Sequence, residues 1–273
     1  MTRARARVAQ SLRALAGRPR LLPLTALLLR ARTVRPALAF VARAGARRHG
    51  TFVYRLRENG LRVAIRHGTG DVVTLGEVFH EHDYRPPAEV EQRLARVGRI
   101  VDLGANVGLF GAFAAARWPQ AEILAFEPDP ANAEVHARTI ALNGLQARWT
   151  LVRSAAGASS GRARFLAGGV ALSRLAGEGD EGDIEVELRD VLPELAGADL
   201  VKMDIEGGEW AILCDPRFRA SPPRALVLEY HPRFCAGGDP REAAESALAG
   251  AGLELRSIWH RPDGHGMVWA WRS

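Results

Sequence analysis

The chain has 273 residues, of which 47% are hydrophobic and 25% charged, an apolar content too high for a disordered chain. Its two cysteines are too few for a disulfide framework or a four-thiolate zinc site, and they indicate a reduced, cytoplasmic protein. No segment has the run of about 18 apolar residues that spans a bilayer, so we do not expect an integral membrane protein.

The positive charge of the chain is concentrated at its beginning. Of the 37 basic residues, 12 are arginines within residues 1–50, which contain no acid, and the remaining 25 are outnumbered by the 31 acids. An acidic body argues against a nucleic-acid-binding surface on the folded domain. Residues 1–50, the N-terminal arm, are predicted to form short helices, because Ala, Leu and Arg favour helices and prolines interrupt them. Two interpretations of the arm remain open: a helical extension that covers or dimerises the domain, or a segment that rests on anionic lipid.

Residues 51–98 are predicted to form an ordered lead-in and cap region. The segments 51–56 and 61–65 flank the turn sequence Glu58-Asn59-Gly60, a pattern that predicts a β-hairpin. Residues 99–273 follow as the main domain.

Strands alternate with helical segments from residue 99 onward. The predicted strands are residues 99–103, 121–126, 149–152, 184–188, 200–203 and 225–230. The predicted helices are residues 107–117, residues 130–142, a segment that begins near residue 208, and residues 241–249. This alternation predicts an α/β fold with a doubly wound, mostly parallel, Rossmann-like sheet, which binds ligands beyond the carboxyl ends of its strands.

Two segments depart from the alternation. Residues 154–183 are rich in Gly, Ala and Ser and are predicted to form a loop or hairpin insertion. Residues 253–259 and 267–271 flank the turn Pro262-Asp263-Gly264 and predict a closing antiparallel strand pair.

The first predicted strand of the main domain ends in a glycine turn, Asp102-Leu103-Gly104-Ala105-Asn106-Val107-Gly108. Gly104 and Gly108 allow a tight turn whose backbone can approach a ligand closely. A dinucleotide site requires the pattern G-x-G-x-x-G, and Asn106 at the middle position counts against an NAD-linked oxidoreductase. Asp102 would repel a pyrophosphate but suits a cation such as an α-amino group or a sulfonium, and S-adenosylmethionine carries both.

Two later strand ends extend this predicted cofactor site. Glu127 ends the second strand, where its carboxylate can accept two hydrogen bonds from ribose hydroxyls. Ser154, at the end of the third strand, is a candidate contact for the adenine. The alternative interpretation is a structural strand–helix turn with an incidental surface glutamate. The predicted cofactor-binding residues are Asp102, Gly104, Asn106, Gly108, Glu127 and Ser154.

Residues 51–235 resemble the FkbM-type family of S-adenosylmethionine-dependent O-methyltransferases. The motifs that carry the resemblance are D-x-G-A-N-x-G at 102–108, F-E-P-x-P at 126–130, K-x-D-x-E-G-x-E at 202–209 and E-Y-H at 229–231. Asn143 at the end of the second helix, and Phe79 and Tyr84 in the lead-in region, also fit the family. The resemblance implies a Rossmann-like methyltransferase sheet with S-adenosylmethionine as its cofactor.

The chain departs from the family pattern on the substrate side. Leu188-Arg189-Asp190 stands where the family usually has a T-L-D triplet, and the Gly-rich stretch 167–183 is irregular. The N-terminal arm lies outside the resemblance.

The block that begins at Lys202 contains the candidate catalytic residues. Asp204 and Glu206 follow a central strand, at the end where the methyl group is expected. A carboxylate or imidazole there can accept the proton of an attacking hydroxyl, which contributes about 10²–10⁴-fold to the rate of an in-line displacement. We rank Asp204 first as this base, followed by Glu206 and His231. For His231 the alternative is a structural histidine at a strand exit, bonded to the backbone.

Other polar residues of this region have weaker interpretations. Oxygens of Asp204, Glu206 and Glu229 could bind Mg²⁺, but we assign no metal ligands. Glu209 is predicted to charge or cap the start of a helix. Lys202, the only lysine of the chain, is predicted to pair with Asp204 or Glu229.

The predicted function is an S-adenosylmethionine-dependent O-methyltransferase that acts on a hydroxyl of a small molecule, sugar, glycolipid or secondary metabolite. This substrate class follows from the resemblance alone. The expected partners are a small-molecule or glycan acceptor, no nucleic acid, and, under the second interpretation of the arm, an anionic membrane surface.

Two further functions were weighed against this one. Methylation of nucleic-acid bases is disfavoured, because Asp204-Ile205-Glu206-Gly207 stands where an N/D-P-P-Y/F-type motif is expected. The alternative from a different class is a membrane-docking or scaffold protein whose cofactor site is vestigial.

Overall fold

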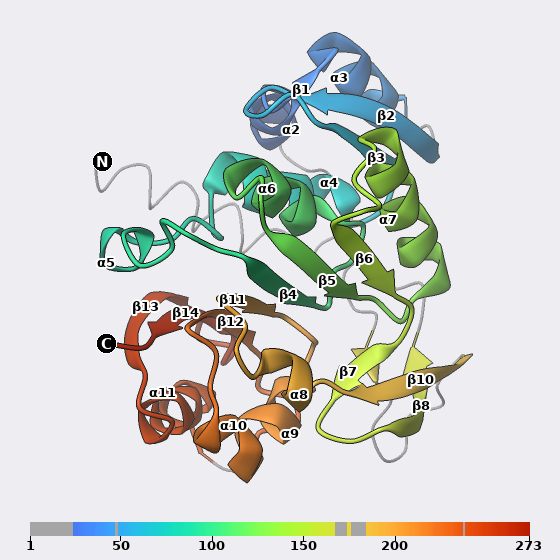
Figure 1. The fold of residues 1–273 in the computed structure, drawn as a ribbon. Helices are drawn as coiled ribbons and strands as arrows, with labels where there is room; N and C mark the ends of the chain where they lie inside the picture. The colour runs from blue at the N-terminus through green and yellow to red at the C-terminus, as the bar shows by residue number, and fades with distance from the viewer. Residues whose placement is uncertain (1–23, 47–48, 167–173, 176–183, 237) are drawn as a thin grey trace. The chain divides into compact units, whose positions relative to one another are not determined.

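The computed structural model describes residues 24–46, 49–166, 174–175, 184–236 and 238–273 (Figure 1). The predictions for residues 1–23 and for most of the Gly-rich stretch 167–183 lie outside the described residues. The chain divides into two compact units, residues 1–84 and residues 85–273. Among the described residues, no helix combines the length and the hydropathy that crossing a bilayer requires.

The first unit is built on a three-stranded antiparallel sheet in the order β1-β2-β3. Strands β2 and β3 pair over their length, which confirms the predicted hairpin. Two short helices, α2 and α3, lie within the N-terminal arm, and Pro36 directly precedes α3. This part of the arm agrees with the prediction of short helices interrupted by prolines. The elements of this unit are α2 (Leu24–Ala31), β1 (Val34–Arg35), α3 (Ala37–Gly45), β2 (Gly50–Leu56), β3 (Arg62–His67), α4 (Asp71–Gly76) and η1 (Glu77–Glu81).

Helix α3 is anchored to this sheet by an aromatic and polar contact. The ring of Phe40 is buried and packs edge-on against the rings of Tyr54 and His67. Arg43 donates a hydrogen bond of 3.0 Å to the hydroxyl of Tyr54. The described part of the arm therefore covers one face of the sheet of its own unit.

The second unit contains a seven-stranded sheet in the order β13-β14-β12-β11-β4-β5-β6. Strands β12, β11, β4, β5 and β6 are parallel to one another, whereas β14 pairs antiparallel with both of its neighbours, β12 and β13. The predicted fold class, a doubly wound and mostly parallel α/β sheet with a closing antiparallel pair, is confirmed. Its strands are β4 (Arg99–Leu103), β5 (Glu122–Phe126), β6 (Trp149–Val152), β11 (Leu200–Met203), β12 (Ala225–Tyr230), β13 (Glu254–His260) and β14 (Gly266–Trp271).

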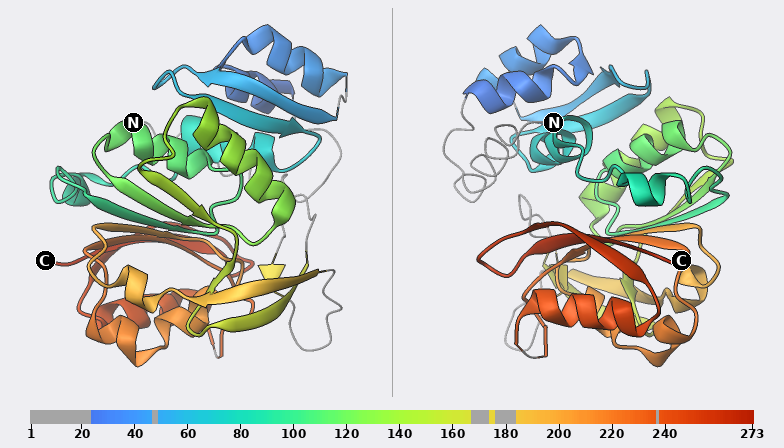
Figure 2. Two further views of the ribbon diagram at one scale, coloured as in Figure 1. Left: turned by 45° about the vertical axis from the view of Figure 1, so that its right-hand side comes forward. Right: turned by 90° about the vertical axis from the view of Figure 1, so that its left-hand side faces the viewer.

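Helices cover both faces of this sheet, with α6 and α7 on one face and α9, α10 and α11 on the other (Figure 2). The central strand β11 is consequently buried at every residue. Strands that are buried on both faces consist of nearly continuous apolar residues, and this pattern allowed them to be predicted from the sequence. The helices of this unit are α5 (Ala88–Glu91), α6 (Leu109–Arg117), α7 (Pro130–Leu142), α8 (Leu192–Leu195), α9 (Glu209–Leu213), α10 (Pro216–Ala220) and α11 (Pro240–Gly250).

The helix predicted to begin near residue 208 is in fact two short helices, α9 and α10. Asp215 separates them, and its side chain accepts a hydrogen bond of 2.8 Å from the amide of Arg217. Pro216 occupies the first turn of α10, a position that suits proline because its missing N–H needs no partner there. An Asp-Pro pair thus ends one helix and begins the next.

A separate four-stranded sheet, in the order β7-β10-β8-β9, combines three strands from the segment 154–183, predicted as a loop or hairpin insertion, with the strand that follows that segment. The predicted strand at 184–188 exists as β10, but it pairs with β7 and β8 and not with the main sheet. Its residues alternate between exposed and partly buried, as in a strand with one solvated face. The strands are β7 (Ala155–Gly157), β8 (Gly161–Leu166), β9 (Arg174–Leu175) and β10 (Ile184–Asp190).

Arg217 joins this smaller sheet to α10. Its guanidinium group contacts the carboxylate of Asp190 at 2.6 Å and the carbonyl oxygen of Ala158 at 2.6 Å. Asp190 is paired with Gly157 in the register of β10 and β7. The side chain of Arg217 therefore contacts the smaller sheet at both of its ends in the chain, just after β7 and at the last residue of β10.

Asp199 ties together the amino ends of the three central strands of the main sheet. Its Oδ2 accepts hydrogen bonds from the amides of Gly98 (2.7 Å) and Arg99 (3.0 Å), and its Oδ1 accepts one from Arg224 (3.0 Å). Partial burial works to raise the pKa of Asp199, but these hydrogen bonds outweigh it and hold the pKa below its ordinary value.

We expect Asp199→Asn to lower the free energy of unfolding by about 1–3 kcal/mol at neutral pH, because hydrogen bonds to a charged group are lost. A carboxylate with a depressed folded pKa stabilises the protein above its unfolded pKa, and this contribution disappears as the pH falls through the folded pKa. Urea denaturation of wild type and variant should therefore converge in acid. Glu242→Gln, on the exposed surface of α11, removes the same charge and is the control. Equal stabilities at neutral pH would contradict this role of Asp199.

Candidate active site

The predicted site residues gather at the carboxyl ends of neighbouring strands of the main sheet. In the register of the sheet, Asp102 of β4 lies opposite Lys202 of β11. Glu127 directly follows β5, and Asp204 directly follows β11. Parallel sheets of this type bind their ligands at this edge.

The turn between β4 and α6 has a left-handed backbone at Gly104 (φ 74°), Asn106 (φ 48°) and Gly108 (φ 82°). The amide of Gly104 donates to the carbonyl oxygen of Phe126 at 3.1 Å. The amide of Asn106 donates to Oε2 of Glu127 at 2.8 Å. The two predicted parts of the cofactor site, the turn and the carboxylate at the end of β5, are thereby held together.

The protein itself fills the space beside both glycines of the turn. A Cβ atom at position 104 would lie 1.8 Å from the carbonyl oxygen of Asp204, and one at position 108 would lie 2.6 Å from Cδ2 of His136. His136 is fully buried, and its Nδ1 faces the carbonyl oxygen of Asn106 at 3.2 Å. Burial lowers the pKa of His136 to about 4, so a neutral ring supports the turn. No pattern in the sequence identified His136 as a site residue, because a histidine within a helix carries no motif.

Glu127 is buried, and protein groups already donate to both of its oxygens. Besides Asn106, the amide of Asp129 donates to Oε1 at 2.9 Å and the side-chain amide of Asn132 at 3.3 Å. Burial raises the pKa of Glu127 to about 7, against the effect of these hydrogen bonds. A carboxylate has about four acceptor positions, so room for a ligand hydroxyl remains, and the predicted contact with ribose stays a prediction.

Asp102 and Lys202 form a buried pair behind the turn. Nζ of Lys202 lies 3.5 Å from Oδ1 of Asp102 and 3.6 Å from Oδ2 of Asp204, and it donates to the carbonyl oxygen of Gly104 at 2.6 Å. The predicted pairing of Lys202 with Asp204 is confirmed, whereas its pairing with Asp102 was not predicted. Asp102 is 0% exposed, so its predicted direct contact with a ligand stays a prediction.

In both residues of this pair, burial and the neighbouring charges have opposite effects on the pKa, and the outcome differs between the two residues. Burial raises the pKa of Asp102 to about 6, although the ammonium group of Lys202 opposes the shift. Burial also works to lower the pKa of Lys202, but the charges of Asp204 and Asp102 outweigh it and leave that pKa above its ordinary value. Lys202 is therefore positively charged at neutral pH beside the turn.

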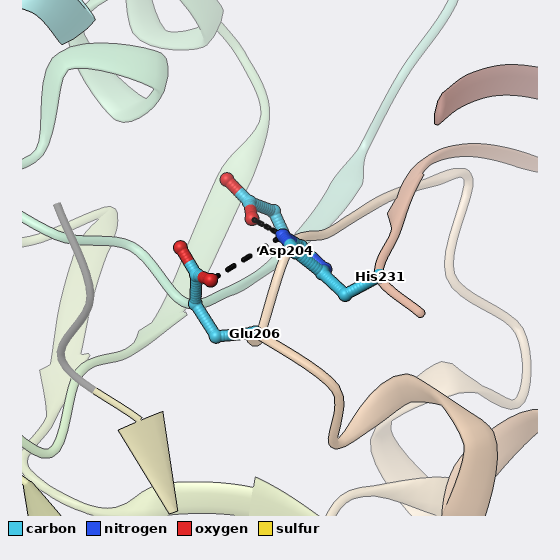
Figure 3. Close-up of side chains that lie close together, drawn as sticks. All are labelled: Asp204, Glu206 and His231. Atoms are coloured by element: carbon cyan, nitrogen blue, oxygen red, sulfur yellow. Dashed lines mark ion pairs between the residues drawn. The ribbon is translucent and has the colours of Figure 1, made fainter. Parts of the chain in front are cut away.

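Asp204, Glu206 and His231, the three predicted catalytic residues, are brought together by the loops after β11 and β12 (Figure 3). Nε2 of His231 lies 3.4 Å from Oε2 of Glu206 and 3.9 Å from Oδ1 of Asp204. The side chains of Asp204 and Glu206 are 25% and 27% exposed, whereas that of His231 is 5% exposed. The two carboxylates can therefore reach a bound substrate, and the imidazole lies behind them.

Glu209 holds the imidazole of His231 in place. Its fully buried carboxylate accepts a hydrogen bond of 2.7 Å from the amide of His231 and faces Nδ1 of the ring at 3.0 Å. It also accepts from the amide of Gly207 at 2.9 Å, beside the start of α9. The predicted role of Glu209 at a helix start is thus only part of its function. The alternative of a His231 ring bonded to the backbone is wrong, because the ring faces carboxylates on both of its nitrogens.

These neighbours determine the charge of His231. Burial works to lower its pKa, but the hydrogen bond to Glu209 and the charges of Glu209, Glu206 and Asp204 outweigh burial and raise the pKa to about 10. With these neighbours alone, the ring is positively charged at neutral pH and is a poor proton acceptor. This result favours Asp204 or Glu206 over His231 as the base.

Two further predicted residues lie at the edges of this region. Ser154, which follows β6, is buried, and its hydroxyl oxygen has no hydrogen-bond partner among the described residues. Glu229, weighed as a third oxygen ligand for a metal, does not join Asp204 and Glu206. Among the described residues, the third member of that group is His231.

We expect Gly104→Ala to destabilise the second unit, because its Cβ would meet the backbone of Asp204, just after β11, and its φ of 74° is unfavourable for alanine. Gly144→Ala is the matched control, since Gly144 has a φ of 65° and no atom within 4 Å of a Cβ. Both variants place alanine on a left-handed backbone, but only Gly104→Ala also overpacks its surroundings. We therefore expect Gly104→Ala to lose about 1–3 kcal/mol more of the free energy of unfolding than Gly144→Ala. Thermal unfolding of the two variants measures the difference, and equal losses would show that the strand ends can move apart.

Three comparisons relate the chain to known proteins. The family described as Methyltransferase FkbM domain matches residues 102–248, more than half of the chain. The methyltransferase sdnD of Sordaria araneosa is 54% identical over 44 residues, which are 16% of this chain and 17% of that protein, so the match spans about a sixth of the curated relative.

Solved methyltransferase structures are similar at low sequence identity. The O-methyltransferase TomG of Streptomyces achromogenes, which is involved in tomaymycin synthesis and was crystallised with S-adenosylmethionine, is 17% identical, with a TM-score of 0.42 over 72% of this chain and 87% of that one. The precorrin-6y C5,15-methyltransferase of Geobacter metallireducens is 15% identical, with a TM-score of 0.40 over 68% of this chain and 87% of that one.

Proposed function

This chain belongs to the FkbM methyltransferase family, and on that premise we propose that it transfers the methyl group of S-adenosylmethionine to a hydroxyl oxygen. The observation that carries the proposal is the pair of partly exposed carboxylates, Asp204 and Glu206, at the strand ends beside the glycine turn. The acceptor is a small molecule, a sugar, a glycolipid or a secondary metabolite.

The residues around the turn fit a sulfonium nucleoside. The hydroxyl of Ser154 is buried without a hydrogen-bond partner among the described residues, as expected of a group that completes its bonding with a ligand. Glu127 retains acceptor capacity for ribose hydroxyls, and the acids of the site favour a cationic ligand. When bound, the cofactor supplies a methyl group activated by a positively charged sulfur.

The chain's own residues would position and deprotonate the acceptor. Asp204 would accept the hydroxyl proton at Oδ1, because its Oδ2 faces Lys202 at 3.6 Å. Lys202 and the imidazole of His231 hold this carboxylate from two sides, so its orientation is set before the acceptor binds. Holding the hydroxyl in line with the methyl group adds to the rate by removing the entropic cost of their encounter.

We expect Ser154→Ala and Glu127→Gln to weaken binding of S-adenosylmethionine, measured by calorimetry on the full chain. Loss of one hydrogen bond to a ligand costs about 0.5–1.5 kcal/mol, or about 2–10-fold in affinity. Glu242→Gln is the surface control. If wild type binds no S-adenosylmethionine, the scaffold interpretation is favoured, and if it binds NAD instead, the oxidoreductase interpretation is favoured.

We expect Asp204→Asn to retain cofactor binding but to slow methyl transfer about 10²–10⁴-fold, since the amide cannot accept the proton. The assay uses labelled S-adenosylmethionine with extracts of the host's glycans and lipids, and mass spectrometry identifies the methylated product. Full activity of this variant would exclude Asp204 as the base and leave Glu206 as the remaining exposed carboxylate.

For the N-terminal arm we propose peripheral contact with an anionic membrane surface. Three leucines of α2 and α3 are unusually exposed, Leu24 (65%), Leu28 (46%) and Leu38 (86%). Residues 1–50 also hold 12 arginines and no acid. Exposed apolar side chains beside a basic sequence are the combination that binds the surface of anionic bilayers.

We expect the full chain to co-sediment with vesicles that contain phosphatidylserine and not with purely zwitterionic vesicles. The triple variant Leu24→Ser, Leu28→Ser and Leu38→Ser should bind less, because the apolar contribution is lost while the charge is kept. Ile258→Ser, an exposed apolar residue of β13, is the control. Equal pelleting of wild type and triple variant would contradict the proposed contact.

A further inference from the structure

We propose that Asp204, Glu206 and His231 bind one divalent metal ion of the Mn²⁺ and Mg²⁺ class. One potential ligand atom from each residue lies within 4.8 Å of the other two. Ligands about 2.2 Å from an ion lie at most about 4.4 Å apart, so the separations of 3.4 and 3.9 Å from Nε2 of His231 fit. The largest separation in the group, at most 4.8 Å, requires one carboxylate to move by a few tenths of an ångström when the ion binds.

The imidazole is prepared for ligation by a buried partner. His231 is 4% exposed and lies close to both carboxylates (Figure 3). Its Nδ1 faces Oε1 of Glu209, which is 0% exposed, at 3.0 Å. A metal-binding histidine almost always donates its other ring N–H to such a group, which fixes the tautomer and the ring orientation. Metal binding would release the proton of Nε2, whose lone pair is then directed at Asp204 and Glu206.

The oxygens of Asp204 have different neighbours. Oδ2 faces Lys202 at 3.6 Å, whereas Oδ1 faces the imidazole at 3.9 Å. One carboxylate can therefore keep its ion pair with the lysine and still provide Oδ1 as a ligand. With the ion bound there, the lower pKa of an ion-bound hydroxyl would take over part of the work assigned to Oδ1 as the base. Because the two oxygens of Asp204 have different partners, metal binding at the proposed site would leave the buried pair of Asp102 and Lys202 intact.

The donor set indicates the class of metal. Carboxylate oxygens suit Mg²⁺ and Mn²⁺, one imidazole nitrogen is accepted more readily by Mn²⁺, and no thiolate is present in the group to favour softer metals. Three protein ligands leave positions open for other oxygens. On the proposed function, on which this step rests, the acceptor hydroxyl would take one of them, and the ion would make that hydroxyl more acidic.

We would test the site with Mn²⁺ on the full chain, after removal of bound metal with a chelator. The electron paramagnetic resonance signal of free Mn²⁺ reports binding without any need for activity. We expect one Mn²⁺ per chain in the wild type, displaced by Mg²⁺. His231→Ala and Glu206→Gln should abolish this binding, and Glu209→Gln should weaken it about 10–100-fold, as for other partners of metal-bound histidines.

Two neighbouring residues provide matched controls. Glu229→Gln removes a nearby acid, and His265→Ala removes an imidazole whose centre lies 5.2 Å from that of His231, but neither belongs to the proposed site. Both variants should bind Mn²⁺ like the wild type. Circular dichroism establishes that each variant is folded before its affinity is compared.

The proposal is overturned if the folded wild type binds no Mn²⁺, or if His231→Ala binds it unchanged. Titration of S-adenosylmethionine in the presence of chelator separates this outcome from failure of the proposed function. If the wild type binds Mn²⁺ but no S-adenosylmethionine, the proposed function alone is contradicted. If it binds S-adenosylmethionine but no Mn²⁺, the metal site alone is contradicted. Folded Asp204→Asn should bind Mn²⁺ more weakly than the wild type, and unchanged affinity of this variant would contradict the proposed three-residue site.

Discussion

A buried ammonium group sets the arrangement of the strand ends. Lys202 is only 4% exposed, and an unpaired charge at such a depth costs several kcal/mol. It is held by the carboxylates of Asp102 and Asp204 and by the carbonyl oxygens of Leu103 and Gly104. Each of these groups belongs to β4, the turn after it, or the tip of β11. The requirement to neutralise one lysine therefore fixes the spacing between the turn and the loop that carries the candidate base.

The fold could be predicted where the signal was local. Apolar runs identified the doubly covered strands, and turn sequences identified the hairpin of the first unit and the closing antiparallel pair. The partner of β10 could not be read in the same way, because strand pairing joins residues that are distant in sequence. The structure shows that Ile184–Asp190 alternates between exposed and more buried residues, as in a strand with one solvated face, unlike the buried strands of the main sheet.

The sequence predicted which residues form the candidate site, but not all of the contacts between them. Asp204, Glu206 and His231 were all identified from their motifs and positions at strand ends, and the structure brings them together. The second function of Glu209 was missed, because it depends on His231, which is 22 residues away and reaches Glu209 only after β12 has formed. The depth of Asp102 was missed for a similar reason: motif position says which strand end a residue occupies, and packing decides whether the side chain is reachable.

The single arginine that joins the smaller sheet to α10 has a consequence for how such a protein can diversify. Because Arg217 holds Ala158 and Asp190 together, the intervening segment leaves and re-enters the domain at nearly the same point. An excursion with adjacent ends can be lengthened, shortened or exchanged at a small entropic cost, without displacing the strands that follow. Variation of that module would leave the glycine turn and the carboxylates of the main sheet in register.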